Sequence, residues 1–101
     1  MLVVSGTIPI KAESRDEAVQ LALDMAKATQ AEDGCLFYQF YADLADPNLI
    51  RVFEEWESEE ALARHMQTDH MATFLKAIPR LVAGPVEAKK YTVSAADPLS
   101  A

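Results

Sequence analysis

Residues 35–56, CLFYQFYADLADPNLIRVFEEW, decide the fold of this 101-residue chain. The first eight of these residues are too aromatic for a comfortable helix and suit a β-strand. Asp43 to Asn48 form a cluster of turn-forming residues around one proline, and a further strand-like run follows from Leu49 to Glu57. The stretch therefore predicts a β-hairpin.

One strand and one helix are predicted before the hairpin. Residues 2–11 are rich in β-branched side chains, which favours a strand. Ser14 and Glu17 have the spacing of a capping box, which predicts a helix from there to about Glu32. The apolar stripe expected to face the core has helical spacing; its members are Val19, Ala22, Leu23 and Ala26.

After the hairpin the sequence predicts two helices and a last strand. Ser58 is placed to cap a short helix, and the stretch Gln67-Thr68-Asp69 offers a cap for a second one, after which Gly84-Pro85 breaks the chain. Residues 86–94 suit a strand. The order β-α-β-β-α-β is the ferredoxin-like plan of an α+β protein, with one antiparallel four-stranded sheet and helices on one face. We expect one domain, residues 1–94, and a C-terminal tail, residues 95–101.

Aromatic side chains are expected on both faces of the first hairpin strand. Phe37 and Tyr41 alternate with Tyr38 and Phe40, whereas a face exposed to water should carry polar residues at every second position. This pattern predicts a homodimer that closes sheet against sheet into a dimeric α+β barrel. The open alternative is a monomer with a few scattered surface aromatics.

Composition excludes several classes of function. Nine Lys and Arg against sixteen Asp and Glu give a net charge of −7, which argues against nucleic-acid binding. The single cysteine, Cys35, permits no intrachain disulfide and no multi-cysteine zinc site, and we expect it to be a small buried hydrophobe. The N-terminus has no basic region, and no apolar run approaches the ~20 residues of a membrane span. These features predict a cytoplasmic protein.

The two histidines are the first candidates for chemistry. His65 and His70 are five residues apart, so on one continuous helix they would point in different directions, and we expect no metal site. His65 follows Ala61 and Leu62 by one turn and should border the interior. It is either a hydrogen-bonded residue at the edge of the core or a proton acceptor in an apolar cavity.

Glu54 and Trp56 are the second candidates. Both should lie on the same side of their strand as Ile50 and Val52. A carboxylate on an apolar face needs a partner or a raised pKa. The simpler interpretation pairs Glu54 with Arg51 or with Lys89 across the sheet, and makes Trp56 a core residue. The aromatic residues, Tyr38 and Phe74 among them, either line a pocket for a flat ring or fill the core and a dimer interface.

Three segments resemble the antibiotic biosynthesis monooxygenase family, and within it the small bacterial quinol monooxygenases. They are Asp33-Gly34-Cys35-x-x-Tyr38, Phe53-Glu54-Glu55-Trp56-Glu57-Ser58 and His65-x-Gln67-Thr68-x-His70-Met71. The resemblance implies a homodimer that oxidises a small aromatic substrate, a quinol or polycyclic phenol, with O2 and without metal, flavin or other cofactor. We assign the catalytic proton transfer to His65 and substrate binding to Trp56, Tyr38, Phe74 and Glu54; His70 is taken as a helix-end or surface residue.

Two other branches of the family fit the sequence less well. Where the haem-degrading members are expected to carry an asparagine, a tryptophan and a haem-ligating histidine, this chain has Gly6, His65 and Leu75. The anthrone-oxidising members pair their strand tryptophan with an asparagine four residues earlier, where this chain has Val52.

Two alternatives to the oxygenase remain open. One is an isomerase or other proton-transfer enzyme on a small polar metabolite, which would need cationic groups such as Arg51, Arg64 or Arg80 in its pocket. The other is a non-catalytic dimeric ligand-binding module.

Overall fold

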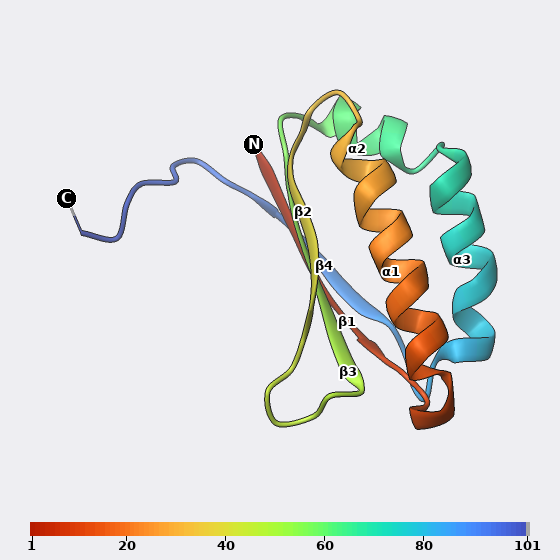
Figure 1. Ribbon diagram of the computed structural model, residues 1–101. Helices are drawn as coiled ribbons and strands as arrows, with labels where there is room; N and C mark the ends of the chain where they lie inside the picture. Colours follow the sequence, from red (N-terminus) through yellow and green to blue (C-terminus); the bar gives the residue numbers. More distant parts are fainter. Residues whose placement is uncertain (101) are drawn as a thin grey trace.

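The polypeptide forms four strands in one sheet with all of its helices on a single face (Figure 1). In the computed structural model, which describes residues 1–100, the sheet order is β2-β3-β1-β4 and every neighbouring pair is antiparallel. The elements are β1 (Leu2–Pro9), the 3-10 turn η1 (Ala12–Ser14), α1 (Arg15–Gln30), β2 (Cys35–Ala42), β3 (Leu49–Trp56), α2 (Glu59–His65), α3 (Asp69–Leu81) and β4 (Glu87–Thr92). The predicted ferredoxin-like α+β fold is confirmed.

The C-terminal segment runs away from the domain (Figure 1). Residues 95–100 contain no helix or strand. The last residue of the predicted tail, residue 101, lies outside the described residues.

Alternation along β3 separates the core from the second face of the sheet. Ile50, Val52, Glu54 and Trp56 are buried under the helices, and Trp56 is 0% exposed. Leu81 of α3 is 1% exposed against the same core. Full burial of such side chains contributes about 1.5–3 kcal/mol each, so this interface between sheet and helices is the main source of stability.

No helix or strand of the described residues covers the second face of the sheet (Figure 1). This face carries aromatic side chains. Phe37 and Tyr41 of β2 are 40% and 50% exposed, and Tyr91 of β4 is 48% exposed. Phe37 also meets Phe53 of β3 edge-to-face, with ring centroids 6.0 Å apart. The prediction that both faces of β2 carry aromatics is confirmed.

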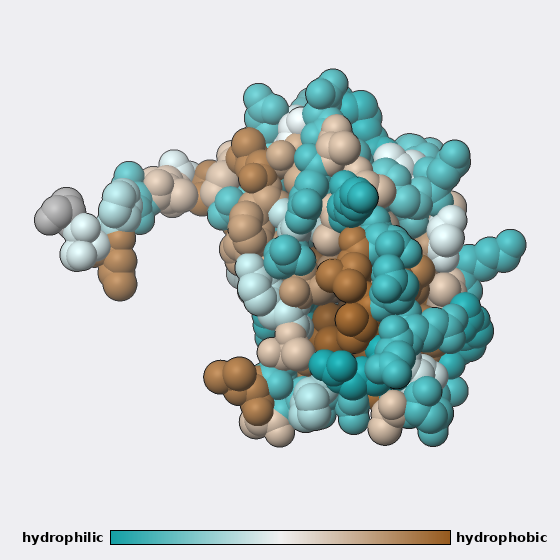
Figure 2. All heavy atoms as spheres, viewed as in Figure 1, coloured by the Kyte–Doolittle hydropathy of each residue, from teal (hydrophilic) through white to brown (hydrophobic). Residues whose placement is uncertain are grey.

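The apolar stripe predicted for α1 is confirmed at Ala26, which is buried, and wrong at Leu23. Its buried residues are Ala18, Met25, Ala26 and Thr29, whereas Leu23 is 57% exposed. The Ser14 side chain also makes no capping hydrogen bond, because the turn η1 precedes the helix and supplies a different start. Leu23 instead lines an apolar groove where α1 meets the β2 edge of the sheet, the brown area near the centre of Figure 2.

The caps predicted for the two later helices are confirmed. The Ser58 hydroxyl accepts a hydrogen bond from the Ala61 amide at 3.2 Å, and the Thr68 hydroxyl accepts one from the Met71 amide at 3.2 Å. Each cap satisfies an amide that has no partner within its own helix. The chain therefore breaks between His65 and Asp69 and starts a new helix in a new direction.

The loop between α1 and β2 depends on Gly34. Its φ is +84°, a region that favours glycine, and a Cβ there would lie 2.5 Å from the Ala61 Cβ of α2. The Gly34 carbonyl also accepts a hydrogen bond from the Glu57 amide at 2.8 Å. Glycine thus lets this loop pack closely on α2.

Substitution Gly34→Ala is expected to destabilise the protein by about 2 kcal/mol, because it adds left-handed strain and a clash. Urea unfolding at a fixed protein concentration measures the change. Gly84→Ala is the matched control, since a Cβ there meets only Pro9 at an ordinary 3.5 Å. Equal unfolding midpoints for Gly34→Ala and Gly84→Ala would contradict this account of the loop.

Candidate active site

A cavity of about 390 Å³ lies between the sheet and the helices α2 and α3. Its wall is mostly apolar, and the polar side chains on it are few. Tyr38, Glu54 and His65 lie deep in the wall, and the edge strand β4 contributes Lys90, which pairs in register with Val4 of the wall. The apolar residues of the wall include Val4, Ile8, Phe40, Val52, Leu62, Met71 and Phe74. The volume and the lining suit a small, largely apolar ligand.

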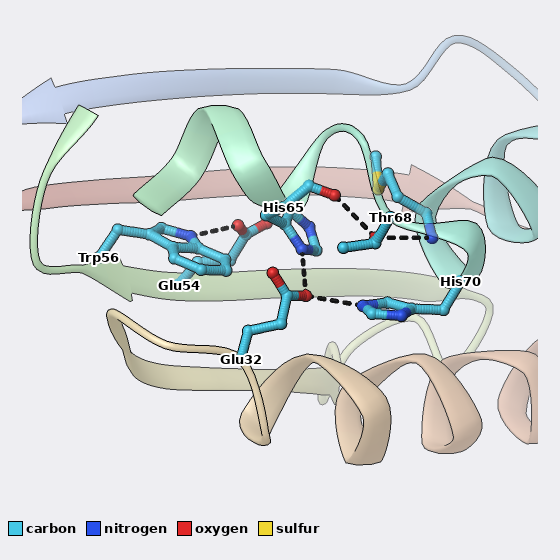
Figure 3. Close-up of polar contacts among 7 residues, drawn as sticks. Glu32, Glu54, Trp56, His65, Thr68 and His70 are labelled. Carbon is cyan, nitrogen blue, oxygen red and sulfur yellow. Dashed lines mark hydrogen bonds and ion pairs between the residues drawn. The ribbon is translucent and has the colours of Figure 1, made fainter. Parts of the chain in front are cut away.

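One carboxylate oxygen joins the two histidines. The Oε2 of Glu32 lies 2.8 Å from the His65 Nδ1 and 2.6 Å from the His70 Nε2 (Figure 3). A carboxylate oxygen accepts, so both ring nitrogens donate to it. With its proton on Nδ1, a neutral His65 ring keeps a lone pair on Nε2. The structure gives this Nε2 no hydrogen bond among residues 1–100.

Thr68 fixes the two histidines relative to each other. Its hydroxyl donates to the His65 carbonyl at 2.7 Å while it accepts from the Met71 amide, so it ties the end of α2 to the start of α3 (Figure 3). The rings of His65 and His70 have centroids 6.0 Å apart as a result.

The two histidines lie on different helices. The prediction that they point in different directions assumed one continuous helix. His65 is the last residue of α2 and His70 is the second residue of α3, so the helical angle between them does not apply. Glu32 was missed because it lies in the loop after α1, far from both histidines in sequence. A turn ending in Gly34 was visible in the sequence, but its packing on α2 was not. His70 does lie at a helix end, as expected, but its ring contacts Glu32 and is half-buried.

Glu54 has a different partner from those expected. Its Oε1 accepts a hydrogen bond from the Trp56 indole nitrogen at 2.8 Å (Figure 3). Arg51 lies on the opposite face of the sheet, where it donates to the Ser5 hydroxyl. The pairing of Glu54 with Arg51 or Lys89 was therefore wrong. Alternation along β3 separates position 51 from position 54, and Lys89 lies opposite Ser5, also on the second face of the sheet.

Burial changes the titration of the deepest polar groups. It raises the pKa of Glu54 from its ordinary value of 4.5 to about 7, against the lowering effect of the Trp56 hydrogen bond, and the nearby Glu32 raises it further. Burial also raises the pKa of Tyr38, to which the carboxylates of Glu54 and Glu32 add. The Tyr38 hydroxyl therefore stays protonated, while Glu54 exchanges its proton near neutral pH.

Cys35 has no features of a reactive thiol. It is half-buried at the start of β2, and burial raises the pKa of its thiol, with Glu32 and Glu54 adding to the effect.

Trp56 is placed behind the cavity wall. It is fully buried and does not line the cavity, but its ring lies 4.7 Å from the His65 ring, centroid to centroid. The Tyr38 ring packs against both of these rings: its centroid lies 5.6 Å from that of His65 and 6.4 Å from that of Trp56. Of the residues expected to bind substrate, Tyr38, Glu54 and Phe74 line the cavity. Their roles, and that of His65, stay predictions.

The fold is a ferredoxin-like α+β domain, and the cavity beside His65 on its helical side is large enough for a small ligand. The family model of the antibiotic biosynthesis monooxygenases matches residues 1–77. The chain belongs to the antibiotic biosynthesis monooxygenase family.

Individual relatives agree with this membership. The protein sll1783 of Synechocystis sp. is 33% identical over 93 residues, which cover 92% of this chain and 63% of that protein, so the chain spans less than two thirds of that relative. A solved structure from Deinococcus radiodurans is 27% identical, covers 100% of both chains and has a TM-score of 0.93. Another, named antibiotic biosynthesis monooxygenase, is 26% identical, covers 94% of this chain and 100% of its own, and has a TM-score of 0.88.

No helix in residues 1–100 has the length and apolar character to cross a membrane.

Proposed function

We propose that the protein is a monooxygenase that oxidises a quinol or a polycyclic phenol with molecular oxygen, without a metal or flavin. The observation that carries the proposal is the apolar cavity beside a histidine whose Nδ1 is held by Glu32. Membership of a family of monooxygenases supports the same class of reaction.

The reaction needs little from the protein because the substrate is its own reductant. Triplet oxygen reacts slowly with closed-shell molecules, and most oxygenases use a metal or flavin for this reason. A deprotonated quinol can pass one electron to O2, and the two radicals can combine to form a carbon–oxygen bond. Loss of water from the resulting hydroperoxide leaves a hydroxyquinone. One oxygen atom of O2 thus enters the ring, and the other leaves as water.

His65 takes the phenolic proton in this proposal. Its Nδ1 donates to Glu32, which keeps the lone pair on Nε2. Tyr38 and Phe74 form part of the apolar wall, which excludes water from the intermediate. Glu54 can hydrogen-bond a second oxygen of the substrate, as donor or acceptor, because its pKa of about 7 keeps both forms available. Trp56 acts indirectly, by holding Glu54 and packing on His65.

Oxygen uptake tests the proposal. Incubation with a menadiol-type quinol is expected to consume O2 faster than the spontaneous reaction of the same quinol. Oxygen uptake at the spontaneous rate would contradict the oxygenase proposal. It would favour a non-catalytic module that binds its ligand in the same cavity. The isomerase is less well supported, since none of Arg51, Arg64 and Arg80 lines the cavity. Lys90 does lie at its edge, but its ammonium group pairs with Glu59 on α2.

We also propose that the chain forms a homodimer through the second face of its sheet. The exposed aromatics Phe37, Tyr41 and Tyr91 lie there around Phe53, on the central strand β3. A second copy would remove this apolar surface from water. A cytoplasmic location stays a prediction from the composition.

Phe53→Glu is expected to turn the dimer into a monomer, because it replaces the central aromatic ring with a second carboxylate beside Glu55 on the same face of β3. Sedimentation equilibrium should give twice the chain mass for the unmodified protein and the chain mass for the variant. Leu44→Glu is the control, since Leu44 is fully exposed in the β2–β3 loop, away from the face. A monomeric unmodified protein, or a dimer that survives Phe53→Glu, would contradict the proposed interface.

A further inference from the structure

We propose that Glu32, His65 and His70 bind one divalent transition-metal ion, of the chemical class of Zn2+ and Co2+, and that the bound ion inhibits the oxygenation. The binding follows from the three donor atoms and their spacing and does not depend on the activity. The inhibition rests on the proposed function.

The three side chains supply a suitable set of donor atoms. The His65 Nδ1, the His70 Nε2 and a Glu32 carboxylate oxygen all lie within 4.8 Å of one another. Two imidazoles and one carboxylate are a common zinc donor set, and at metal–ligand distances of ~2.1 Å tetrahedral ligands lie roughly 3.4 Å apart. The Glu32 Oε2 is now 2.8 Å and 2.6 Å from the two nitrogens, so an ion needs each oxygen–nitrogen distance to lengthen by less than about 1 Å. The two nitrogens already lie within 4.8 Å of each other.

The site has negative charge and no competing cation. In the described part of the chain, Glu32 forms its ion-pair contacts with the two histidines and with no lysine or arginine. An added cation would relieve this excess of negative charge.

The site is both rigid and open at one end. The Thr68 side chain ties the backbones that carry the two histidines, so little ordering is needed on binding. The exposed fraction of the side chains rises from 2% at His65 through 13% at Glu32 to 27% at His70. An ion can therefore enter beside the His70 ring, where water can complete the coordination shell.

A bound ion would change the protonation of the His65 Nε2, the ring nitrogen that we propose accepts the substrate proton. With the metal on Nδ1, the proton of a neutral imidazole lies on Nε2, which then donates and cannot accept a phenolic proton. The cluster would thus hold His65 in an active form when Glu32 is its partner and in an inactive form when a metal is its partner.

Titration of the chelator-treated full-length protein with Co2+ tests the binding directly. We expect visible absorption bands of a four-coordinate ion that saturate at one equivalent, and displacement of Co2+ by Zn2+. Because His65 and His70 are the only histidines of the chain, such bands can be assigned to this cluster. His70→Ala and Glu32→Gln should each weaken binding by more than ~100-fold, beyond the ~10–100-fold cost of losing an outer-shell partner. Glu13→Gln, at an exposed carboxylate in η1, should leave binding unchanged.

The outcomes separate this proposal from the proposed function. Absence of the bands, or equal Co2+ affinity in all variants, would overturn the metal site whatever the activity. If oxygen uptake with a quinol is present, Zn2+ should abolish it in the unmodified protein and not in His70→Ala. Tight Zn2+ binding without loss of oxygen uptake would overturn the inhibition. Absence of oxygen uptake in the metal-free protein would count against the oxygenase and leave the binding result intact.

Discussion

His65→Ala is expected to lower the rate of quinol oxygenation by about 100- to 10,000-fold, the usual contribution of a positioned general base. The loss should appear in kcat, because the proton acceptor acts in the reaction and the apolar wall still binds the ring. Steady-state oxygen uptake, corrected for the spontaneous rate, measures it. The result follows from the site, where Glu32 holds the Nδ1 of a ring that is 1% exposed at the cavity wall.

Two further measurements separate a base from a packing residue. His65→Gln fills more of the space than alanine does and should lose activity to a similar degree if proton transfer is the role. Added imidazole should restore part of the activity of His65→Ala, because it can enter the space left by the ring. Circular dichroism checks that both variants fold. A folded His65→Ala protein with unchanged kcat would remove the assignment.

Glu54→Gln is expected to stabilise the protein by on the order of 3 kcal/mol at pH 8 and to have little effect near pH 4. The reason is that burial raises the pKa of Glu54 to about 7, while the unfolded chain titrates near 4.5. Between these values the folded state holds a proton that the unfolded state has lost, so stability falls as the pH rises. Above pH 7 the folded state carries the whole cost of the buried charge. Glutamine keeps an acceptor for Trp56 and removes the titration.

Urea unfolding of the protein and the variant at several pH values tests this prediction, with protein concentration held fixed. The difference between the two unfolding free energies should grow from about pH 4.5 to 7 and then level off. Glu13→Gln is the control for an exposed carboxyl. A difference that is independent of pH would show that Glu54 titrates normally in the folded state. Reduced oxygenation by the more stable variant would indicate that the buried carboxyl is kept for its function.

The sequence alone predicts the order of helices and strands, and it predicts which face of β3 is buried under the helices. Alternation along β3 correctly placed Glu54 and Trp56 inside, and the caps at Ser58 and Thr68 located the two later helices. These predictions depend on local patterns, which a single chain segment carries. The prediction for α1 failed at Leu23 because this side chain packs at the sheet edge, and a helical stripe alone does not distinguish an edge groove from the core.

The polar cluster could not be predicted because it depends on tertiary contacts. Glu32 reaches His65 only because Gly34 lets its loop approach Ala61, and the α2–α3 junction turns His70 toward the same oxygen. Similarly, the partner of Glu54 is its neighbour on the same face, Trp56, and not a base across the sheet. In each case the sequence shows which side chains are present, but it does not show which of them contact one another in the folded protein.

Incorporation of an oxygen atom from O2 into the product tests the proposed oxygenation most directly. The chelator-treated protein is incubated with a menadiol-type quinol under 18O2, and the products are analysed by mass spectrometry. We predict a hydroxylated quinone that carries one 18O atom, formed faster than without protein and at the spontaneous rate with His65→Ala. Quinone without incorporated 18O, or equal labelling in the presence and absence of protein, would contradict a metal-free oxygenation in this cavity.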